Sequence, residues 1–314
     1  MKKIRIHLSG TPHDYPEGLV PLLIQHLGYS IEWVDSNRCD LLIYGAFHQT
    51  RKPKSLIPKP LRPWLNKNPT KQIPVKRGPL TLFHTYESLR HDHIPADFAI
   101  SFDLGVTRAN HLRLPYWYEL VDWSNEGIIG NRNPRYGELL SLTRLSQPLG
   151  TQFLSRPQEA VLISSHLLEP RKILFEAVGR TIPITGMGPY FDPTIRNHHQ
   201  SSFVKKEVLQ NFAFNLCPEN QLYPGYYTEK IPEAFLAGCL PLTWIDSNVH
   251  CDFNPKALIN LAPMTADNFA PLGEIVHDRS ALQELGEQPL LTDQPSLEPV
   301  KSFIQEIIRQ AMSA

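Results

Sequence analysis

Hydrophobic and polar positions along the chain alternate between the two-residue period of strands and the longer period of helices. The strand-like runs of the N-terminal half are Lys3–Leu8, Cys39–Tyr44 and Leu80–Thr85. Gly18–Gly28 has the composition of a helix that ends at a glycine. The alternation resumes at Ala160 and predicts parallel sheets with helices on their faces. Glu298–Met312 is expected to form a closing amphipathic helix.

Two domains fit the length of 314 residues, because one domain usually takes about 100–200 residues. The segment Asn125–Gln158 is rich in Gly, Asn, Arg and Pro, and we expect the domain boundary there. We therefore predict an α/β protein with one domain over residues 1–150 and a second over residues 151–314.

The most informative part of the chain is its segment from Asn211 to Leu261. The pattern predicts a strand at Phe212–Cys217, a polar and aromatic loop at Pro218–Tyr227, a helix at Glu229–Ala237 with Thr228 as N-cap and Gly238 as its end, and a strand at Cys239–Trp244. A loop that leads into a helix start binds anions, because unpaired N–H groups and the helix dipole point there. Lys230 adds a positive charge, and Glu219 and Glu229 add acceptors suited to sugar or ribose hydroxyls. These features outline a nucleotide-sugar site.

Many spaced residues of this segment form one specific pattern. They are Phe214-Asn215-Leu216, Glu219-Asn220, Tyr226-Tyr227-Thr228-Glu229-Lys230-Ile231, Ala234-Phe235, Pro241 and Phe253-Asn254-Pro255. The pattern resembles the donor-binding motif of the GDP-fucose-dependent α-1,3/1,4-fucosyltransferases, family 10 of the glycosyltransferases. Further blocks extend the resemblance to about Leu80–Leu261: His84–Ser88, Asp97–Asp103, Leu112–Tyr118, Ala160–His166, Pro170-Arg171 and Gly186–Gly188.

The resemblance implies a GT-B architecture, in which two Rossmann-like domains face each other across a cleft. It assigns acceptor binding to residues 1–150 and nucleotide-sugar binding to residues 151–314. The activity that it implies is an inverting transfer of L-fucose from GDP-fucose to a glycan hydroxyl, in α-1,3 or α-1,4 linkage, by analogy in bacterial surface-glycan assembly. The donor-binding residues that it indicates are Arg171, Glu219, Asn220, Tyr226, Thr228, Glu229 and Lys230.

Glu87 follows a predicted strand and precedes a loop that contains His91, Asp92 and His93. Catalytic groups occur at such strand ends in open α/β sheets, although a solvent-exposed carboxylate is the commoner role of a Glu. The resemblance places the family's proposed catalytic glutamate at this position. We therefore predict Glu87 as general base, with His91, Asp92 and His93 as candidates on the acceptor side.

Negative charge on the departing diphosphate must be met by a metal ion or by groups of the protein. Transferases of the other major fold usually hold a divalent ion with an Asp-x-Asp motif, which is absent from this sequence. We expect no obligatory metal and no other cofactor, with the charge met by Lys230, Arg171 and the helix start at Thr228. Without the resemblance, Arg171 is also reasonably interpreted as a surface charge at a helix start. Lys230 lies in the first turn of its helix, where a positive charge is unfavourable because of the helix dipole, and a bound phosphate would explain this placement.

Composition agrees with this class of protein. The formal net charge is zero, so no overall field attracts nucleic acid or membrane. The start of the chain, with Arg5 and His7 interrupting its apolar run, does not have the pattern of a signal peptide. The four cysteines form no Cys-x-x-Cys pair and read as thiols of a reducing compartment. We expect a cytoplasmic protein, with the inner membrane as a peripheral site of attachment.

One segment, Arg51–Arg77, has nine Lys or Arg, six Pro and no acidic residue, together with Trp64 and several aliphatic residues. One interpretation is a solvated surface loop. The other is docking on an anionic membrane surface or a polyanionic acceptor, where each basic residue contributes about 1 kcal/mol and Trp64 suits the interface.

Three departures from the family pattern lie near the expected donor. Gln221 stands where the family usually has Ser or Thr, Pro218 replaces a common aromatic residue, and Trp244–Asp246 replaces a smaller turn. These leave two alternatives open. The first is a transferase of another nucleotide sugar on the same scaffold, and the second is a catalytically silent protein that binds a glycan or a nucleotide.

Overall fold

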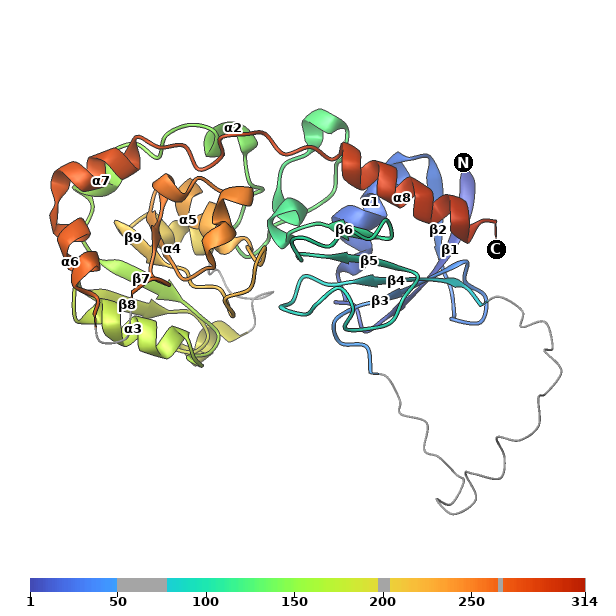
Figure 1. The fold of residues 1–314 in the computed structure, drawn as a ribbon, viewed down its shortest axis with the longest axis horizontal. Helices are drawn as coiled ribbons and strands as arrows, with labels where there is room; N and C mark the ends of the chain where they lie inside the picture. The colour runs from blue at the N-terminus through green and yellow to red at the C-terminus, as the bar shows by residue number, and fades with distance from the viewer. Residues whose placement is uncertain (50–77, 197–203, 265–267, 314) are drawn as a thin grey trace, which may run out of the picture.

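The structure, a computed structural model, describes residues 1–49, 78–196, 204–264 and 268–313. The basic segment Arg51–Arg77, for which the sequence allows a surface loop or a membrane-docking role, lies outside the described residues. Two sheets organise the described part of the chain, and helices pack around both (Figure 1). The predicted α/β class with parallel sheets is confirmed.

The N-terminal sheet has six strands in the order β2-β1-β3-β4-β5-β6, with every pair parallel. The strands are β1 (Lys2–Ser9), β2 (Tyr29–Trp33), β3 (Leu41–Tyr44), β4 (Leu80–His84), β5 (Phe98–Ser101) and β6 (His111–Arg113). All four residues of β5 are buried, as in a strand that is covered on both faces. Helix α1 (Leu19–His26) ends just before Gly28, whose φ of +89° confirms the predicted glycine end.

The C-terminal sheet has five parallel strands in the order β11-β10-β9-β7-β8. They are β7 (Ala160–Ile163), β8 (Ile184–Met187), β9 (Phe214–Leu216), β10 (Leu240–Thr243) and β11 (Ile259–Asn260). The helices of this half are α2 (Leu142–Leu145), α3 (Arg171–Gly179), α4 (Lys205–Leu209), α5 (Lys230–Leu236), α6 (Ala270–His277) and α7 (Arg279–Gly286). Strands β9 and β10 are buried at every position and form the centre of this core.

Two segments connect the two sheets, one over residues 114–159 and the other from Gly286, the last residue of α7, to residue 297. They are hydrogen-bonded to each other, because the Leu291 amide donates to the Leu145 carbonyl (2.9 Å) and the Gly150 amide donates to the Gly286 carbonyl (2.8 Å). The second segment leads into α8 (Glu298–Ala311), which confirms the predicted closing helix.

Helix α8 returns to the N-terminal sheet and lies beside α1 (Figure 1). The ring of Phe303 packs edge-on against that of Phe98, with 5.6 Å between centroids, and Lys301 forms an ion pair with Glu126 at 2.8 Å. The division into residues 1–150 and 151–314 stays a prediction. Helix α8 belongs to the second range by sequence but packs against the N-terminal half.

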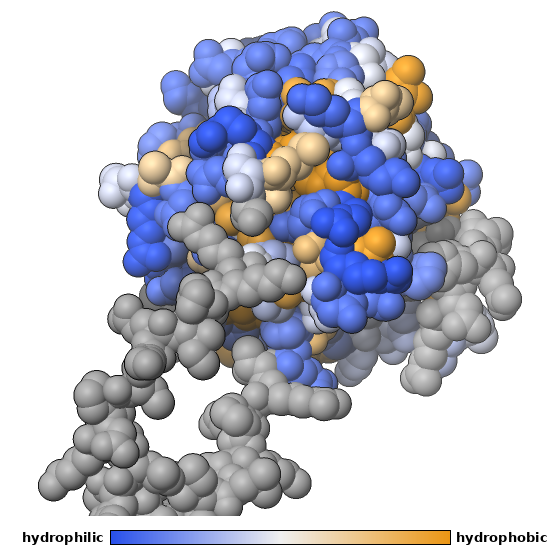
Figure 2. Space-filling model, turned by 90° about the vertical axis from the view of Figure 1, so that its right-hand side faces the viewer, coloured by the Kyte–Doolittle hydropathy of each residue, from blue (hydrophilic) through white to orange (hydrophobic). Residues whose placement is uncertain are grey.

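The outer end of the N-terminal half is largely hydrophilic, with smaller hydrophobic areas between the polar side chains (Figure 2). Scattered apolar residues of this kind are ordinary on a protein surface. Among the helices that the structure describes, none combines the length and the apolar character that a membrane crossing requires.

A buried polar cluster lies beneath the end of β4. The Tyr15 hydroxyl is 2.7 Å from Nδ1 of His84, and Glu119 accepts hydrogen bonds from the Leu19 amide (2.7 Å) and from the Tyr86 hydroxyl. Burial lowers the pKa of His84 to about 3, so the ring is neutral. Burial raises the pKa of Glu119 to about 7, although both of its hydrogen bonds favour the ionised form.

The raised pKa of Glu119 predicts a pH-dependent cost to stability. The group stabilises the fold most below its unfolded pKa of about 4.3, and this stability is lost as the pH rises towards about 7. Glu119→Gln cannot ionise, so its free energy of unfolding relative to wild type should rise by about 2–3 kcal/mol between pH 5 and pH 8. Chemical denaturation at several pH values measures this difference, and the His84 contribution cancels in it.

Glu274→Gln, on the exposed surface of α6, is the matched control and should show no pH-dependent difference from wild type. A constant difference between Glu119→Gln and wild type over this range would mean that the buried carboxyl titrates normally.

Candidate functional site

The loop between β9 and α5 is held by the carboxylate of Glu219, whose side chain is 0% exposed. It accepts hydrogen bonds from the Thr228 amide (2.7 Å), from the Thr228 hydroxyl (2.8 Å) and from Nζ of Lys230 (2.7 Å). A buried carboxylate is stable only when it is paired and hydrogen-bonded in this way. Glu219 therefore shapes the loop and positions Lys230, and its direct contact with a donor stays a prediction.

The predicted N-cap role of Thr228 is wrong. Helix α5 begins at Lys230, and Glu229 occupies the cap position without a side-chain cap. The Thr228 hydroxyl bonds Glu219 across the loop, because a buried charged acceptor is a stronger partner than the neutral amides of the next turn. The predicted end of the helix is confirmed, since Gly238 follows the last turn with a φ of +76°.

Lys230 stays charged in a buried setting. Burial disfavours its charge, but the carboxylates of Glu219 and Glu229 outweigh this effect and raise the pKa of Lys230. Burial likewise disfavours the charge of Glu229, yet Lys230 and Lys205 together lower the pKa of Glu229. Each charge in this group is thus maintained by neighbours of opposite sign.

Arg171, the first residue of α3, lies on the other side of the same loop. Its guanidinium donates to Oδ1 of Asn220 (2.6 Å) and to Oγ of Ser164 (3.1 Å), and it approaches Nε2 of His166 at 2.7 Å. The Asn220 amide in turn lies 3.4 Å from the Tyr226 hydroxyl. Burial lowers the pKa of Arg171 despite nearby carboxylates. Consecutive residues, Glu219 and Asn220, therefore each hold one cation.

Glu87 lies across from this loop, on the exposed turn after β4. Its amide donates to Oγ1 of Thr85 at 3.1 Å. The next residue, Ser88, is hydrogen-bonded to the side chain of Gln221 at 3.0 Å, and Glu87 is among the charges that act on Tyr226. The structure thus brings the turn of Glu87 next to the predicted donor loop.

A buried aspartate, Asp103, organises the rest of this turn. Its carboxylate accepts from the amide of His91 (2.5 Å) and lies 3.0 Å from Nδ1 of the same ring and 3.0 Å from Nε of Arg90. The guanidinium of Arg90 stacks on the ring of Tyr223 in the donor loop, 4.6 Å from its centroid. Asp103 follows β5, and this position at a strand end is the signal by which the sequence could have indicated it.

The other two acceptor-side candidates are exposed. Asp92 follows His91, and both residues line a pocket on the N-terminal sheet. The ring of His93 lies 6.2 Å from that of Phe83 and is not among the residues that line this pocket. Across the described ranges, no three side chains converge as ligands of a metal ion, and turnover without metal stays a prediction.

An ion pair that the sequence analysis missed joins the two halves. Arg113, at the end of β6, donates both terminal nitrogens to the carboxylate of Asp252 at 2.8 Å each. It also donates to the carbonyls of Phe102 and Gly225 at 3.0 Å. Gly225 has a φ of +90°, and a Cβ at this position would lie 2.4 Å from the Phe102 carbonyl, so only glycine fits this approach.

Comparison with known proteins gives one curated relative. The chain is 27% identical over 233 residues to the α-(1,3)-fucosyltransferase FucT of Helicobacter pylori. This alignment covers 67% of the chain and 47% of the relative, so the chain spans about half the length of that protein. Over this alignment the chain is similar to an α-1,3-fucosyltransferase. No protein-family model matches it.

Solved α-1,3-fucosyltransferases have the same fold. A structure with GDP-fucose superposes with a TM-score of 0.65 at 22% identity, covering 98% of this chain and 91% of the other. A structure with GDP superposes with a TM-score of 0.63 at 21% identity, covering 100% and 91%. The predicted GT-B architecture is thereby confirmed.

Gln221, one of the two departures from the fucosyltransferase pattern within the loop Pro218–Tyr227, makes the contact with Ser88 described above. A Ser or Thr at this position would be shorter than Gln by two side-chain atoms. The structure therefore gives the departure a role in joining the donor loop to the turn of Glu87.

The Arg113–Asp252 pair should be a major contribution to stability. Arg113→Gln or Asp252→Asn leaves a largely buried charge without its partner, and each should cost about 3–5 kcal/mol in free energy of unfolding. The double variant should cost less than the sum of the two, because neither charge is then stranded. Denaturant unfolding of the four proteins measures this coupling.

The Arg5–Asp40 pair, whose side chains are 49% and 20% exposed against 21% and 4% for Arg113 and Asp252, is the matched control, and its double-variant cycle should show a much smaller coupling. Equal coupling in the two cycles would show that burial does not strengthen the Arg113 pair.

Proposed function

We propose that the protein is an inverting glycosyltransferase that moves L-fucose from GDP-fucose to a hydroxyl of a glycan acceptor, in α-1,3 or α-1,4 linkage. The relationship to α-1,3-fucosyltransferases supports this proposal and favours the α-1,3 linkage. The fold that the chain shares with the solved enzymes supports it as well.

The observation that carries the proposal is the Ser88–Gln221 hydrogen bond of 3.0 Å between the two halves. It brings a carboxylate of the N-terminal half, Glu87, to the loop that holds two cations of the C-terminal half. A base on one side and positive charges on the other are what a single displacement requires, because the acceptor oxygen attacks opposite the leaving diphosphate.

The two cations retain N–H groups for a phosphate. Lys230 has three N–H donors, and its contacts within the described residues use two of them, to Glu219 and Thr228. Arg171 has five, and its contacts to Asn220, Ser164 and His166 use three. Within the described residues, Arg171 has no carboxylate at ion-pair distance, so a half-buried cation lies ready for an anionic ligand.

In the proposed reaction, the oxygen of an acceptor hydroxyl forms a bond to the anomeric carbon of fucose. The proton of that hydroxyl passes to the carboxylate of Glu87. The bond from that carbon to the β-phosphate oxygen breaks at the same time. Lys230 and Arg171 stabilise the negative charge that develops on GDP. Tyr226 and Asn220 lie between them and orient the donor. No obligatory metal takes part in this proposal.

GDP should bind without added metal, and both cations should contribute to its affinity. Arg171→Ala and Lys230→Ala each remove a charge-assisted bond and should raise the Kd for GDP about 10- to 100-fold. Isothermal titration calorimetry in the presence of a chelator measures these values. Lys172→Ala removes an exposed charge next to Arg171 and should leave the Kd unchanged.

Wild-type affinity in both variants would remove the two cations from the site. Activity that is lost on chelation and restored by magnesium or manganese would contradict the metal-free reaction.

Glu87→Gln should lower kcat by about 10²- to 10⁴-fold, because it keeps the shape of the side chain and removes the base. Its Kd for GDP should stay close to that of wild type, since the donor cations lie in the other half. Single-turnover transfer from GDP-fucose measures the first value and calorimetry the second. Normal turnover by Glu87→Gln would show that Glu87 is not the general base. Asp92 and His91 would then be the next candidates for that role.

A panel of nucleotide sugars separates the remaining alternatives. Hydrolysis of GDP-fucose above all other donors supports the proposed donor. Hydrolysis of a different nucleotide sugar would assign the scaffold to that sugar, and binding without any hydrolysis would indicate a silent binding protein.

A further inference from the structure

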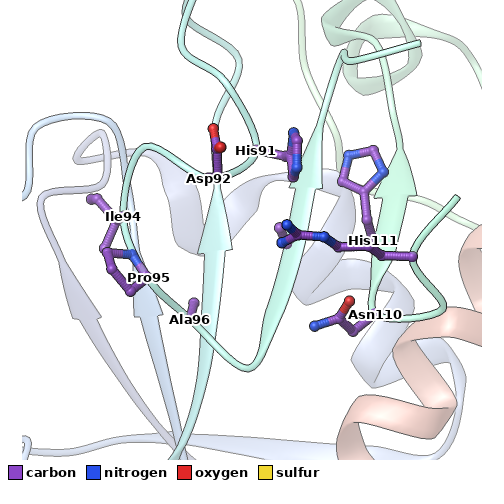
Figure 3. A pocket seen from close by; sticks show the side chains of 9 residues that line it. His91, Asp92, Ile94, Pro95, Ala96, Asn110 and His111 are labelled. Atoms are coloured by element: carbon purple, nitrogen blue, oxygen red, sulfur yellow. The ribbon is translucent and has the colours of Figure 1, made fainter. Parts of the chain in front are cut away.

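A pocket of about 270 Å³ lies on the N-terminal sheet, beneath the chain that runs from the end of β4 to the start of β5. It is lined by His91, Asp92, Ile94, Pro95, Ala96, Ala99, Arg108, Asn110 and His111 (Figure 3). The crossover from β4 to β5 contains no helix among its described residues, so loop residues rather than a helix cover this part of the sheet face. Pockets for drug-sized ligands take roughly 300–1,000 Å³, so this one has room for a single ring rather than an extended chain.

A buried hydrogen-bond network determines which ring nitrogen of His111 carries the proton. The Ser101 hydroxyl donates its one proton to Asp103 (3.1 Å) and accepts from the Asp103 amide (3.2 Å). Nε2 of His111, 2.9 Å from the same hydroxyl, must therefore be the protonated nitrogen and the donor. Burial lowers the pKa of His111 to about 4, with His91 adding to this effect, so the ring is neutral and its Nδ1 is an acceptor.

The other polar side chains of the pocket have similarly defined roles. The Asn110 amide donates one N–H to the Asp97 carbonyl at 2.7 Å, which leaves its second N–H as a donor and its oxygen as an acceptor. Asp92 adds a carboxylate, and Arg108 is the one cation among the lining residues. Acceptors and donors beside the apolar residues Pro95 and Ala99 match a ring that carries many hydroxyl groups, because each hydroxyl both donates and accepts.

We infer that this pocket binds one neutral sugar ring of the acceptor glycan, with Arg108, His111, Asn110 and Asp92 hydrogen-bonding its hydroxyls. The inference rests on the proposed function and names the subsite for the acceptor. Glu87 and the pocket residues His91 and Asp92 belong to the same crossover between β4 and β5, and this shared segment is the basis for assigning the pocket to the acceptor.

Saturation-transfer NMR with methyl hexopyranosides and methyl N-acetylhexosaminides tests the inference directly, without turnover. At least one neutral glycoside should bind wild type. Ala96→Trp should abolish this binding by filling the pocket, and Arg108→Ala should weaken it about tenfold. Arg279→Ala removes an exposed arginine of α7 and serves as the matched control with wild-type binding. In transfer assays, Arg108→Ala should raise the acceptor KM more than it lowers kcat.

Equal binding to wild type, Ala96→Trp and Arg108→Ala would overturn the inference, as would binding of methyl hexuronides alone, which would assign an anion site. Failure of every neutral glycoside to bind wild type, up to its solubility limit, would overturn it too. The GDP affinity of each variant, which depends on the other half, reports whether it is folded. Sugar binding to a wild-type protein that does not bind GDP would count against the transferase and not against the sugar pocket.

Discussion

The arrangement of the donor loop depends on the buried carboxylate of Glu219. Its negative charge keeps Lys230 ionised inside the protein, and its oxygens hold the backbone and the hydroxyl of Thr228. Without this carboxylate the ammonium would lose most of its compensation, and a buried lysine tends to become neutral. The charge of Lys230, which we propose meets a phosphate, therefore has a permanent partner in Glu219.

The two halves are held in register by contacts of a different kind. Arg90 stacks on Tyr223, Phe102 packs edge-on against Tyr223 and Tyr226, and Arg113 reaches Asp252. Cations on aromatic faces and bidentate ion pairs have strong directional preferences, which hydrophobic contacts lack. These directional contacts, together with hydrophobic packing, determine the position of Glu87 relative to the loop Pro218–Tyr227.

The elements that local signals determine could be predicted from the sequence. The strands β1, β3 and β4 follow from their apolar runs, and the helix end at Gly238 follows from the need for a positive φ. Arg113 and Asp252 are 139 positions apart, and no local pattern links them. Thr228 was misassigned because the sequence does not show that the nearby Glu219 is buried. The role of Asp103 likewise depends on which side chains the fold brings around it.

The return of α8 to the N-terminal sheet gives the chain an unusual mechanical constraint. Two tethers join the halves, and hydrogen bonds at Leu145–Leu291 and Gly150–Gly286 bind one tether to the other. A single tether would let the halves swivel, whereas a pair of bonded tethers resists torsion. Motion of one half relative to the other is thus confined to motions that bend both tethers together, and a fragment cut at residue 150 would expose the surface of α1 that α8 covers.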